Sequence, residues 1–546
     1  MNNTDNKKLN KYLYLITLLP IAVLLTFNLF QYCENDDMFI YNIAYGKYEA
    51  SAINYATHIH PLLGGIWKFL YSSFNNINWI VLTYLLLVII CTCILMNLLT
   101  NYLKIGYVIA LSLVFETIFC CWFTYTVIGS FATFFGIVTL LKALKDSNIK
   151  NKPFLFILSI FLVEIGFLLR FSMFISTVLI TVPFVVYYLR KINRVNKKLI
   201  LFLGISIILL CIVNIWSDYS LNNSRRNAEY RKWDDMRVKA VDYPIMEYDN
   251  YKDFYESISY SENDYEGLAF TKYIADKDVY SYNNLKKIVD NTPFNIRYNV
   301  NLLSVILIII KLKEVWIFIC FWLICFFAVS KKKLYVVVQG LLALGSIVGQ
   351  VVINRYVHRV FVPLLIVSSI ILTIVTLENI KKNYEKFFYI GTLIICSIYC
   401  VISVKQLSMH NNHTVKAQEK YKQFCNYINQ HKENLYITNG NGPIIDKESV
   451  QLFNNKEKYL NLMSLYNYDL YNDTYYRKVK EYKLTHKDRL IMDITDNNVF
   501  YVDLDNNGLK NIKKYIEEHS KRRLIIKKEK EMKKAKCTIY KIRYRE

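Results

Sequence analysis

The sequence predicts an α-helical protein that crosses a membrane many times and carries a helical loop domain and a small C-terminal α/β domain outside the membrane. The chain has 546 residues, of which 54% are hydrophobic, and several of its apolar runs are long enough to span a bilayer. Its net charge is +23, and much of the excess lies in short Lys and Arg clusters between these runs, as in cytoplasmic loops. Charge placed in this way indicates a lipid bilayer rather than a nucleic acid as the partner.

Residues 1–216 are expected to form an N-terminal membrane domain with seven spans. Lys7, Lys8 and Lys11 precede the first apolar run, and no small-residue cleavage site follows it. This places the N-terminus in the cytoplasm and the acidic loop 31–78 outside. Lys and Arg clusters after the even-numbered spans support the same orientation. The seven spans are expected at residues 12–30, 79–99, 105–123, 125–141, 154–169, 171–188 and 199–216.

Residues 217–299, rich in Tyr, Asp and Asn, are expected to form an extracytoplasmic loop domain. A second membrane domain, residues 300–404, follows. Its first apolar segment, 300–310, is too short to cross and indicates an interfacial or re-entrant helix. Four further spans are expected at residues 315–329, 334–353, 361–377 and 387–404.

The total of about eleven spans places the C-terminal domain, residues 405–546, outside the cell membrane. Its strands are expected to alternate with helices, which predicts a small α/β domain. The strands are expected at residues 435–438, 499–502, 523–526 and 538–542.

Ionisable residues gather at the predicted outer ends of the spans. Asp36 and Asp37 directly follow the first span, where bare carboxylates cost solvation energy unless something uses them. Two histidines lie in the same loop, and arginines occupy the outer turns near residues 170 and 355–359. The candidate site residues are Asp36, Asp37, His58, His60, Arg170, Arg355, His358 and Arg359.

This set suits a reaction between a hydroxyl and a lipid phosphate. A carboxylate can take the proton from an attacking hydroxyl, so Asp36 and Asp37 are the candidate catalytic residues. Arginine presents a planar fork of donors that matches phosphate oxygens. The three arginines, together with the three histidines of the set, are therefore the candidate phosphate-binding residues. Because a departing phosphate is already a weak base, we expect no general acid. Arginines would stabilise the phosphate and no third histidine lies near His58 and His60, so we expect no cofactor and no metal.

Three other interpretations of these residues stay open at this point. The acids can be solvated loop residues, and arginines at the ends of spans can simply reach the lipid headgroups. His58 and His60 can bind zinc together with Asp36. Glu116 and Glu164 lie within predicted spans, where they either pack in the protonated form or line a polar cavity.

The same residues carry a resemblance to a known superfamily. The run Glu34-Asn35-Asp36-Asp37 after the first span, about eleven spans and an outer C-terminal domain together resemble the GT-C integral-membrane glycosyltransferases. A finer pattern resembles a group of bacterial polytopic membrane proteins associated with surface polysaccharides. It is carried by Asn35-Asp36-Asp37, His60-Pro61-Leu62-Leu63-Gly64, Phe167-Leu168-Leu169-Arg170-Phe171 and the stretch from Trp233 to Pro244.

The resemblance implies a transferase at the outer face of the cell membrane, with Asp36 or Asp37 as the base. It would move a sugar from a polyprenyl-phosphate donor to a cell-surface glycan or lipid-linked acceptor. The alternatives are a polysaccharide polymerase or ligase, and a transporter or flippase of lipid-linked sugar. A transporter is expected to have broken spans in matching halves, whereas only the span with Gly340, Gly345 and Gly349 is rich in glycine.

Overall fold

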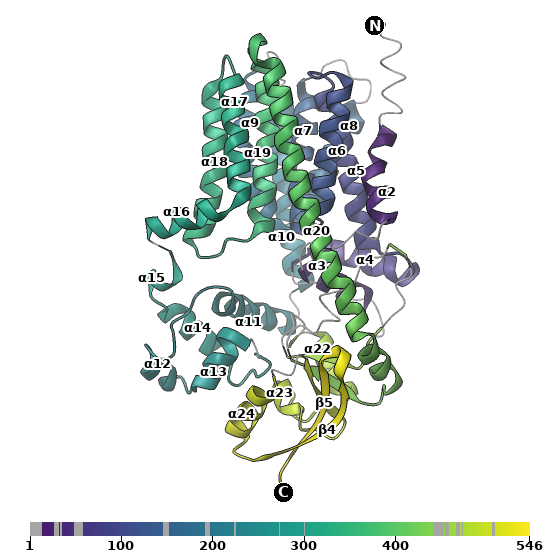
Figure 1. Ribbon diagram of the computed structural model, residues 1–546, viewed down its shortest axis with the longest axis vertical. Coiled ribbons are helices and arrows are strands. Elements are labelled where there is room, and N and C mark those ends of the chain that lie inside the picture. Colours follow the sequence, from purple (N-terminus) through teal and green to yellow (C-terminus); the bar gives the residue numbers. More distant parts are fainter. Residues whose placement is uncertain are drawn as a thin grey trace.

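The molecule has two parts stacked along its long axis (Figure 1). Long helices form a bundle at one end, and shorter helices with a small sheet form what we call the roof at the other. The computed structural model describes residues 14–26, 32, 35–47, 58–145, 152–191, 197–222, 225–271, 274–299, 301–439, 452–453, 458–465, 470–471, 473–504 and 508–546. The fold is mostly helical and has a small C-terminal sheet, as predicted.

Each predicted span that falls in the described residues corresponds to a helix of the bundle. The bundle helices are α2 (Leu18–Thr26), α5 (Trp79–Leu99), α6 (Ile105–Cys121), α7 (Tyr125–Lys145), α8 (Lys152–Leu169), α9 (Phe171–Leu189), α10 (Lys197–Asn222), α17 (Lys313–Ala328), α18 (Lys333–Val352), α19 (His358–Asn379) and α20 (Glu385–Gln430). Within the described ranges, 7 segments are long and apolar enough to cross a membrane, and several other apolar helices are shorter. This supports a membrane protein, while the count of about eleven spans and the side that each end faces stay predictions.

One of the seven segments, Phe294–Lys311, is divided into α15 (Phe294–Arg297) and α16 (Leu302–Lys311). Helix α16 lies across the end of the bundle rather than along it (Figure 1). Its ten residues extend about 15 Å, half of the roughly 30 Å of a bilayer core. Because one side of α16 buries Val305 while most of its other apolar side chains are exposed, it has the geometry expected of an interfacial helix.

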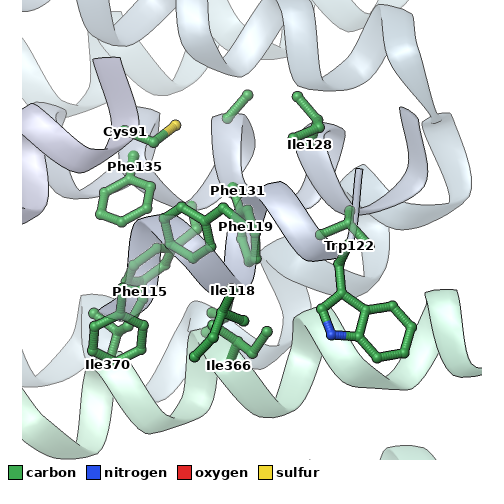
Figure 2. Close-up of a cluster of buried hydrophobic side chains, with 14 of the residues drawn as sticks. Cys91, Phe115, Ile118, Phe119, Trp122, Ile128, Phe131, Phe135, Ile366 and Ile370 are labelled. Carbon is green, nitrogen blue, oxygen red and sulfur yellow. The ribbon is translucent and has the colours of Figure 1, made fainter. Parts of the chain in front are cut away.

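Aromatic side chains fill the centre of the bundle. In Figure 2, phenylalanines of α6 and α7 lie against one another and against isoleucines of α19. The rings of Phe119 and Phe131 are 4.1 Å apart between centroids, and Phe115 extends the cluster. These contacts join helices that are far apart in the sequence.

Helices α7 and α8 approach each other unusually closely because glycines face the contact. A Cβ atom added to Gly166 would lie 2.2 Å from Thr133 Oγ1 and 2.7 Å from the carbonyl oxygen of Gly129. One added to Gly136 would lie 2.8 Å from Val163 Cγ2. This contact sets the positions of Tyr125, the first residue of α7, and of Arg170, which directly follows α8.

The roof combines residues 217–299 with the C-terminal segment, and both lie at the same end of the bundle (Figure 1). Its sheet has the strand order β2-β1-β3-β5-β4, in which β1, β2 and β3 are parallel and β5 is antiparallel to both of its neighbours. The roof strands are β1 (Leu435–Thr438), β2 (Leu462–Ser464), β3 (Val499–Leu504), β4 (Leu524–Met532) and β5 (Cys537–Tyr544). The roof helices are α11 (Arg225–Val241), α12 (Lys252–Ser257), α13 (Glu262–Glu266), η1 (Gly267–Thr271), α14 (Tyr282–Asn291), α22 (Asp473–Glu481), α23 (Leu490–Asp493), α24 (Leu509–Ser520) and η3 (Lys533–Ala535).

The two segments of the roof share one hydrophobic core. The ring of Trp233 meets that of Tyr471 edge-on, with centroids 4.9 Å apart. Arg489 forms a 2.9 Å ion pair with the fully buried Asp276. Residues 217–299, predicted as a domain of their own, are therefore packed together with the C-terminal segment.

The roof is attached to the bundle through the acidic loop and through one long helix. Helix α3 (Asn35–Tyr45) buries Phe39 and Ile43 in a cluster with Phe424 of α20 and residues of the sheet. Helix α20 runs without interruption from the bundle into the roof, over 46 residues. The sheet is thus in contact with the helix that carries both candidate aspartates.

Candidate functional site

Asp36 and Asp37 lie in the first turn of α3, where the positive end of the helix dipole favours carboxylates. Asp36 Oδ2 is 2.6 Å from Arg359 Nη1, and both side chains are largely buried. Arg359 is the second residue of α19. The structure therefore brings together an acid and an arginine that the sequence places more than three hundred residues apart.

Asp37 is fully buried and is held by two donors. Its Oδ1 accepts a 2.7 Å hydrogen bond from the backbone N–H of Tyr125 and a 3.1 Å bond from the hydroxyl of Tyr84. Burial raises the pKa of Asp37 to about 7, against the opposing effect of hydrogen bonds from Thr124 and Tyr125. A carboxyl with this pKa exchanges its proton near neutral pH.

Tyr125, the first residue of α7, also holds two of the predicted phosphate-binding residues. Arg170 Nη1 donates to the Tyr125 hydroxyl at 2.7 Å, and the guanidinium lies 5.2 Å from the centre of the Tyr125 ring. His58 stacks parallel to the same ring, with centroids 6.2 Å apart. The N–H of Tyr125, its ring and its hydroxyl therefore join Asp37, His58 and Arg170 into one site.

The surroundings of His58 are strongly positive. Burial lowers the pKa of His58 well below its usual value, and Arg170, Arg359, Arg237 and Arg355 lower it further. His58 is therefore neutral at pH 7 in the unliganded site. An anion that balanced these guanidiniums would relieve the repulsion between them.

The four arginines differ in their partners. Arg359 pairs with Asp36, Arg355 with Asp242 at 2.7 Å, and Arg237 with Asp234 at 2.6 Å. Arg170 instead donates hydrogen bonds to the hydroxyl of Tyr125 and, at 3.1 Å, to the hydroxyl of Ser172. Within the described residues, no carboxylate forms an ion pair with Arg170. Arg170 is thus the arginine best placed to take an anionic ligand.

Arg355 and His358 line the edge of this group. Arg355 also stacks over the ring of Tyr243 at 5.2 Å, so that it ties the turn between α18 and α19 to the roof. His358 lies 3.8 Å from the buried Glu314 and stacks over Trp122 with centroids 6.5 Å apart. Arg355 lies in the turn before α19, and His358 is the first residue of α19, directly before Arg359.

His60 has a structural role instead of a binding role. It is the N-cap residue of α4 (Pro61–Ser73), and its Nδ1 accepts a 3.2 Å bond from the N–H of Leu62. Its Nε2 is 2.9 Å from the carbonyl oxygen of Asn214. Because both ring nitrogens are used in this way, the zinc site of His58, His60 and Asp36 has no support.

Two acids inside the bundle lie outside this group. Glu116 of α6 is fully buried among apolar side chains. Glu164 of α8 accepts a hydrogen bond from the amide of Asn214 in α10. Neither joins the acid–arginine group in the described part of the chain.

A small apolar groove of about 50 Å³ lies between helices of the bundle, with Glu314 in its lining. Helices α6, α17, α19 and α20 form its walls, and Glu314 is the one acid among its lining residues. The residues that line it include Phe115, Ile118, Phe318, Phe321, Leu365 and Tyr399. Glu314 lies 3.8 Å from His358, which directly precedes Arg359 in the sequence, so one side of this groove is near Arg359.

Searches against protein-family models, curated proteins and solved structures find no match to this chain. The resemblance to GT-C glycosyltransferases therefore stays a prediction from the motifs.

In the described residues, one set of three potential metal ligands converges: His486, Asp493 and Asp496. It lies in the roof, next to α23. Asp493 Oδ1 accepts a 2.6 Å bond from the N–H of His486, and Asp496 accepts bonds from the N–H and hydroxyl of Thr485. These hydrogen bonds indicate that the two acids stabilise the turn at residues 485–486.

Sequence reasoning missed Tyr125, Tyr84 and Arg237. Tyr125 is an aromatic residue at the start of a predicted span, and its neighbours give only a weak indication of its role. Arg237 lies in the stretch from Trp233 to Pro244, which the resemblance singled out without assigning a residue. A polar residue followed directly by a span-initial tyrosine, Thr124-Tyr125, is the weak signal that was present.

Proposed function

We propose that this protein is a membrane glycosyltransferase that moves a sugar from a polyprenyl-phosphate donor to a cell-surface glycan or lipid-linked acceptor. One observation carries the proposal: the adjacent Asp36 and Asp37 contact Arg359 and the Tyr125 group at the roof end of the bundle. Buried charge at the end of a membrane bundle is costly and is usually retained for a function. Acids beside guanidiniums provide both a proton acceptor and a phosphate site.

In the proposed reaction, the acceptor hydroxyl oxygen attacks the anomeric carbon of the donor sugar. The bond from that carbon to the phosphate oxygen breaks, and its electron pair leaves with the polyprenyl phosphate. Asp36 takes the hydroxyl proton and later releases it to water. Arg170 and Arg359 stabilise the charge that develops on the departing phosphate.

The contacts favour different roles for the two aspartates. Asp37 is fixed by Tyr84 and Tyr125 and has no exposed surface, so it positions the start of α3. Asp36 forms an ion pair with Arg359, one of the two arginines proposed to bind the phosphate. When a phosphate engages Arg359, Asp36 becomes available as the base.

The apolar groove supports a lipid-linked donor. It borders the turn of Arg359 through His358 and Glu314, and its walls are apolar side chains of four bundle helices. An isoprenoid chain lying there would place its phosphate toward the arginines. The volume of about 50 Å³ means that side chains must move to admit a whole chain.

The proposal is tested by transfer from labelled donors. Membranes that contain the protein are supplied with radiolabelled polyprenyl-phosphate sugars and candidate glycan acceptors. We expect transfer from at least one donor, with the same rate when a chelator is present, because arginines rather than a cation hold the phosphate. Transport of an intact lipid-linked sugar without transfer would instead favour the flippase alternative, and repeated extension of one glycan would favour the polymerase.

A further inference from the structure

Besides the apolar groove, the bundle has a partly polar cavity at the end opposite the roof. Its volume is about 450 Å³, much larger than that of the apolar groove. It is formed by the last turns of α5, α7 and α9 and by the residues that follow α5. Helix α5 starts beside the roof, where the N–H of Asn78 donates to the carbonyl oxygen of Leu452, so the end of α5 lies at the far side of the bundle.

The lining of this cavity is apolar on one side and cationic on the other. Leu98, Val138, Leu141 and Phe184 form the apolar part, and all four are buried. The polar part consists of Lys142 and Lys145 from the last turn of α7, with Asn101, Tyr102 and Tyr188. No carboxylate is among the lining residues in the described part of the chain.

The acid nearest to the lining tyrosines is already neutralised. Glu378 accepts hydrogen bonds from Tyr102 at 2.6 Å, Tyr187 at 2.6 Å and Tyr188 at 3.3 Å, and it pairs with Lys191 at 2.5 Å. With these four donors, its charge is balanced without Lys142 or Lys145. Lys142 and Lys145 are therefore not needed to balance the charge of Glu378.

The side chains of both lysines have defined contacts beside the cavity. Lys142 Nζ donates to Asn97 Oδ1 at 2.6 Å, and Lys145 Nζ lies 5.5 Å from the centre of the Tyr188 ring. Basic side chains that line a pocket between membrane helices are a common way to bind phosphate-bearing lipid headgroups. The apolar part of the lining suits the first carbons of a lipid chain.

We infer that this cavity binds the phosphate of an anionic lipid in the membrane leaflet opposite the roof, through Lys142 and Lys145. The side-chain amide of Asn101, which has a second N–H besides the one donated to the Asn97 carbonyl oxygen, would donate a further hydrogen bond to the phosphate or to the glycerol. This site is separate from the acid–arginine site, and the inference holds whether or not the proposed transferase reaction is correct. The simpler role of the lysines, offsetting the negative ends of α5, α7 and α9, requires no ligand.

Lipid binding to the purified full-length protein in a neutral detergent tests the inference. Short-chain phosphatidylglycerol is titrated and bound lipid is counted by native mass spectrometry, with phosphatidylcholine and glycerophosphate as parallel probes. We expect phosphatidylglycerol to bind and the Lys142→Gln/Lys145→Gln variant to bind it about 10- to 30-fold more weakly, since each basic residue near a lipid phosphate contributes about tenfold or less. Lysine-dependent binding of glycerophosphate as well would identify a free phosphate as a second source of the same ligand.

Two further variants separate a binding role from a structural one. Lys142→Arg/Lys145→Arg keeps the charge and is expected to keep the affinity. Lys382→Gln/Lys386→Gln removes two lysines at the same end of the bundle and is expected to leave the affinity within about twofold. The inference is overturned if phosphatidylcholine binds as well as phosphatidylglycerol, or if the Gln variant unfolds at a lower temperature but binds the anionic lipid normally.

Discussion

Tyr125 uses three of its parts to hold three groups of the site: its N–H binds Asp37, its ring stacks with His58 and its hydroxyl accepts from Arg170. A single residue can do this because it begins a helix, where the backbone N–H has no partner within the helix. Replacing the hydroxyl alone would therefore affect only Arg170. The residue shows how a neutral side chain can organise a charged site.

Arg170 is expected to dominate the binding of an isoprenyl phosphate. Hydrogen bonds to charged groups contribute about 1.5–3 kcal/mol, so Arg170→Gln should weaken the binding of farnesyl phosphate about 10- to 100-fold. Arg231→Gln is the control, since Arg231 pairs with Asp218 on the exposed surface of the roof. Isothermal titration with each variant measures the effect, and equal affinity of the two variants would contradict the assignment.

The raised pKa of Asp37 predicts a pH-dependent stability. The unfolded chain releases this proton near pH 4 and the folded chain near pH 7, so the contribution of Asp37 to stability falls as pH rises between these values. Asp37→Asn should remove this dependence. The stability of the variant relative to the native chain is expected to increase from pH 5 to pH 7, by at most about 1.4 kcal/mol per pH unit.

Thermal unfolding at several pH values checks this expectation. Asp235→Asn is the matched control, because Asp235 is exposed and pairs with Lys239. Its stability difference from the native chain should change little over the same range. A constant difference for Asp37→Asn would mean that the buried carboxyl titrates as it does in the unfolded chain.

The types of residue that form the site could be predicted from the sequence, but the contacts that each residue makes could not. Acids after a span and arginines at outer turns stand out in a membrane sequence because charge there is expensive. The cap formed by His60 was not predictable, because it depends on a contact with Asn214 more than 150 residues away. The pairing of Arg359 with Asp36 likewise requires the fold.

At the scale of elements, the contact of α7 with α8 determines where Tyr125 and Arg170 meet. Gly129, Gly136 and Gly166 allow the backbones to approach until a single added carbon would collide. Small residues have this role in many membrane helix pairs. The sequence shows these glycines, but it does not show which helix they face.

Gly166→Ala is expected to destabilise the protein by about 1–3 kcal/mol, because the added carbon would overlap a backbone carbonyl that cannot move cheaply. The same change at Gly345 meets nothing within 4 Å and should be neutral or stabilising by up to about 1 kcal/mol. Unfolding in detergent compares the two variants. Equal stability of the two variants would show that α7 and α8 can move apart to admit the added carbon without loss of folding free energy.

The elements themselves were largely predictable, since apolar runs and charge clusters mark most of the helices. Two differences have physical causes. The last span was predicted to end at residue 404, but helix α20 continues to Gln430, and no Pro or Gly interrupts residues 405–430. Strand β2 has three residues, too few for an alternating pattern, and it is stabilised by pairing with β1.

At the scale of the whole molecule, the roof is one packed body that connects to the site through α3. Residues 217–299 and the C-terminal segment have no shared pattern in the sequence, so their common core could not be predicted. Their contacts include a 2.7 Å bond between His519 and Asp264. Through Phe39 and Ile43, the same body restrains the helix that carries Asp36.

Trp233→Ala should therefore loosen both segments of the roof at once. Trp233 donates a 2.7 Å hydrogen bond to the carbonyl oxygen of Tyr280 and packs against Tyr471, and removal of such a side chain costs about 3–5 kcal/mol. Limited proteolysis is expected to cut within 217–299 and after 435 at similar rates. Trp216→Ala is the control, since Trp216 is exposed on α10, and both segments should stay resistant to the protease in this variant. Cleavage of only one segment in Trp233→Ala would argue for two independent domains.

The central claim is that Asp36 is the base of a sugar transfer at the roof end of the bundle. The most direct measurement is the single-turnover rate of transfer by Asp36→Asn, with farnesyl phosphate binding measured on the same preparation. We predict a rate about 100- to 10,000-fold below that of the native chain, with binding changed much less, because the variant keeps the shape and loses the proton acceptor. A near-normal rate of transfer by Asp36→Asn would contradict the claim.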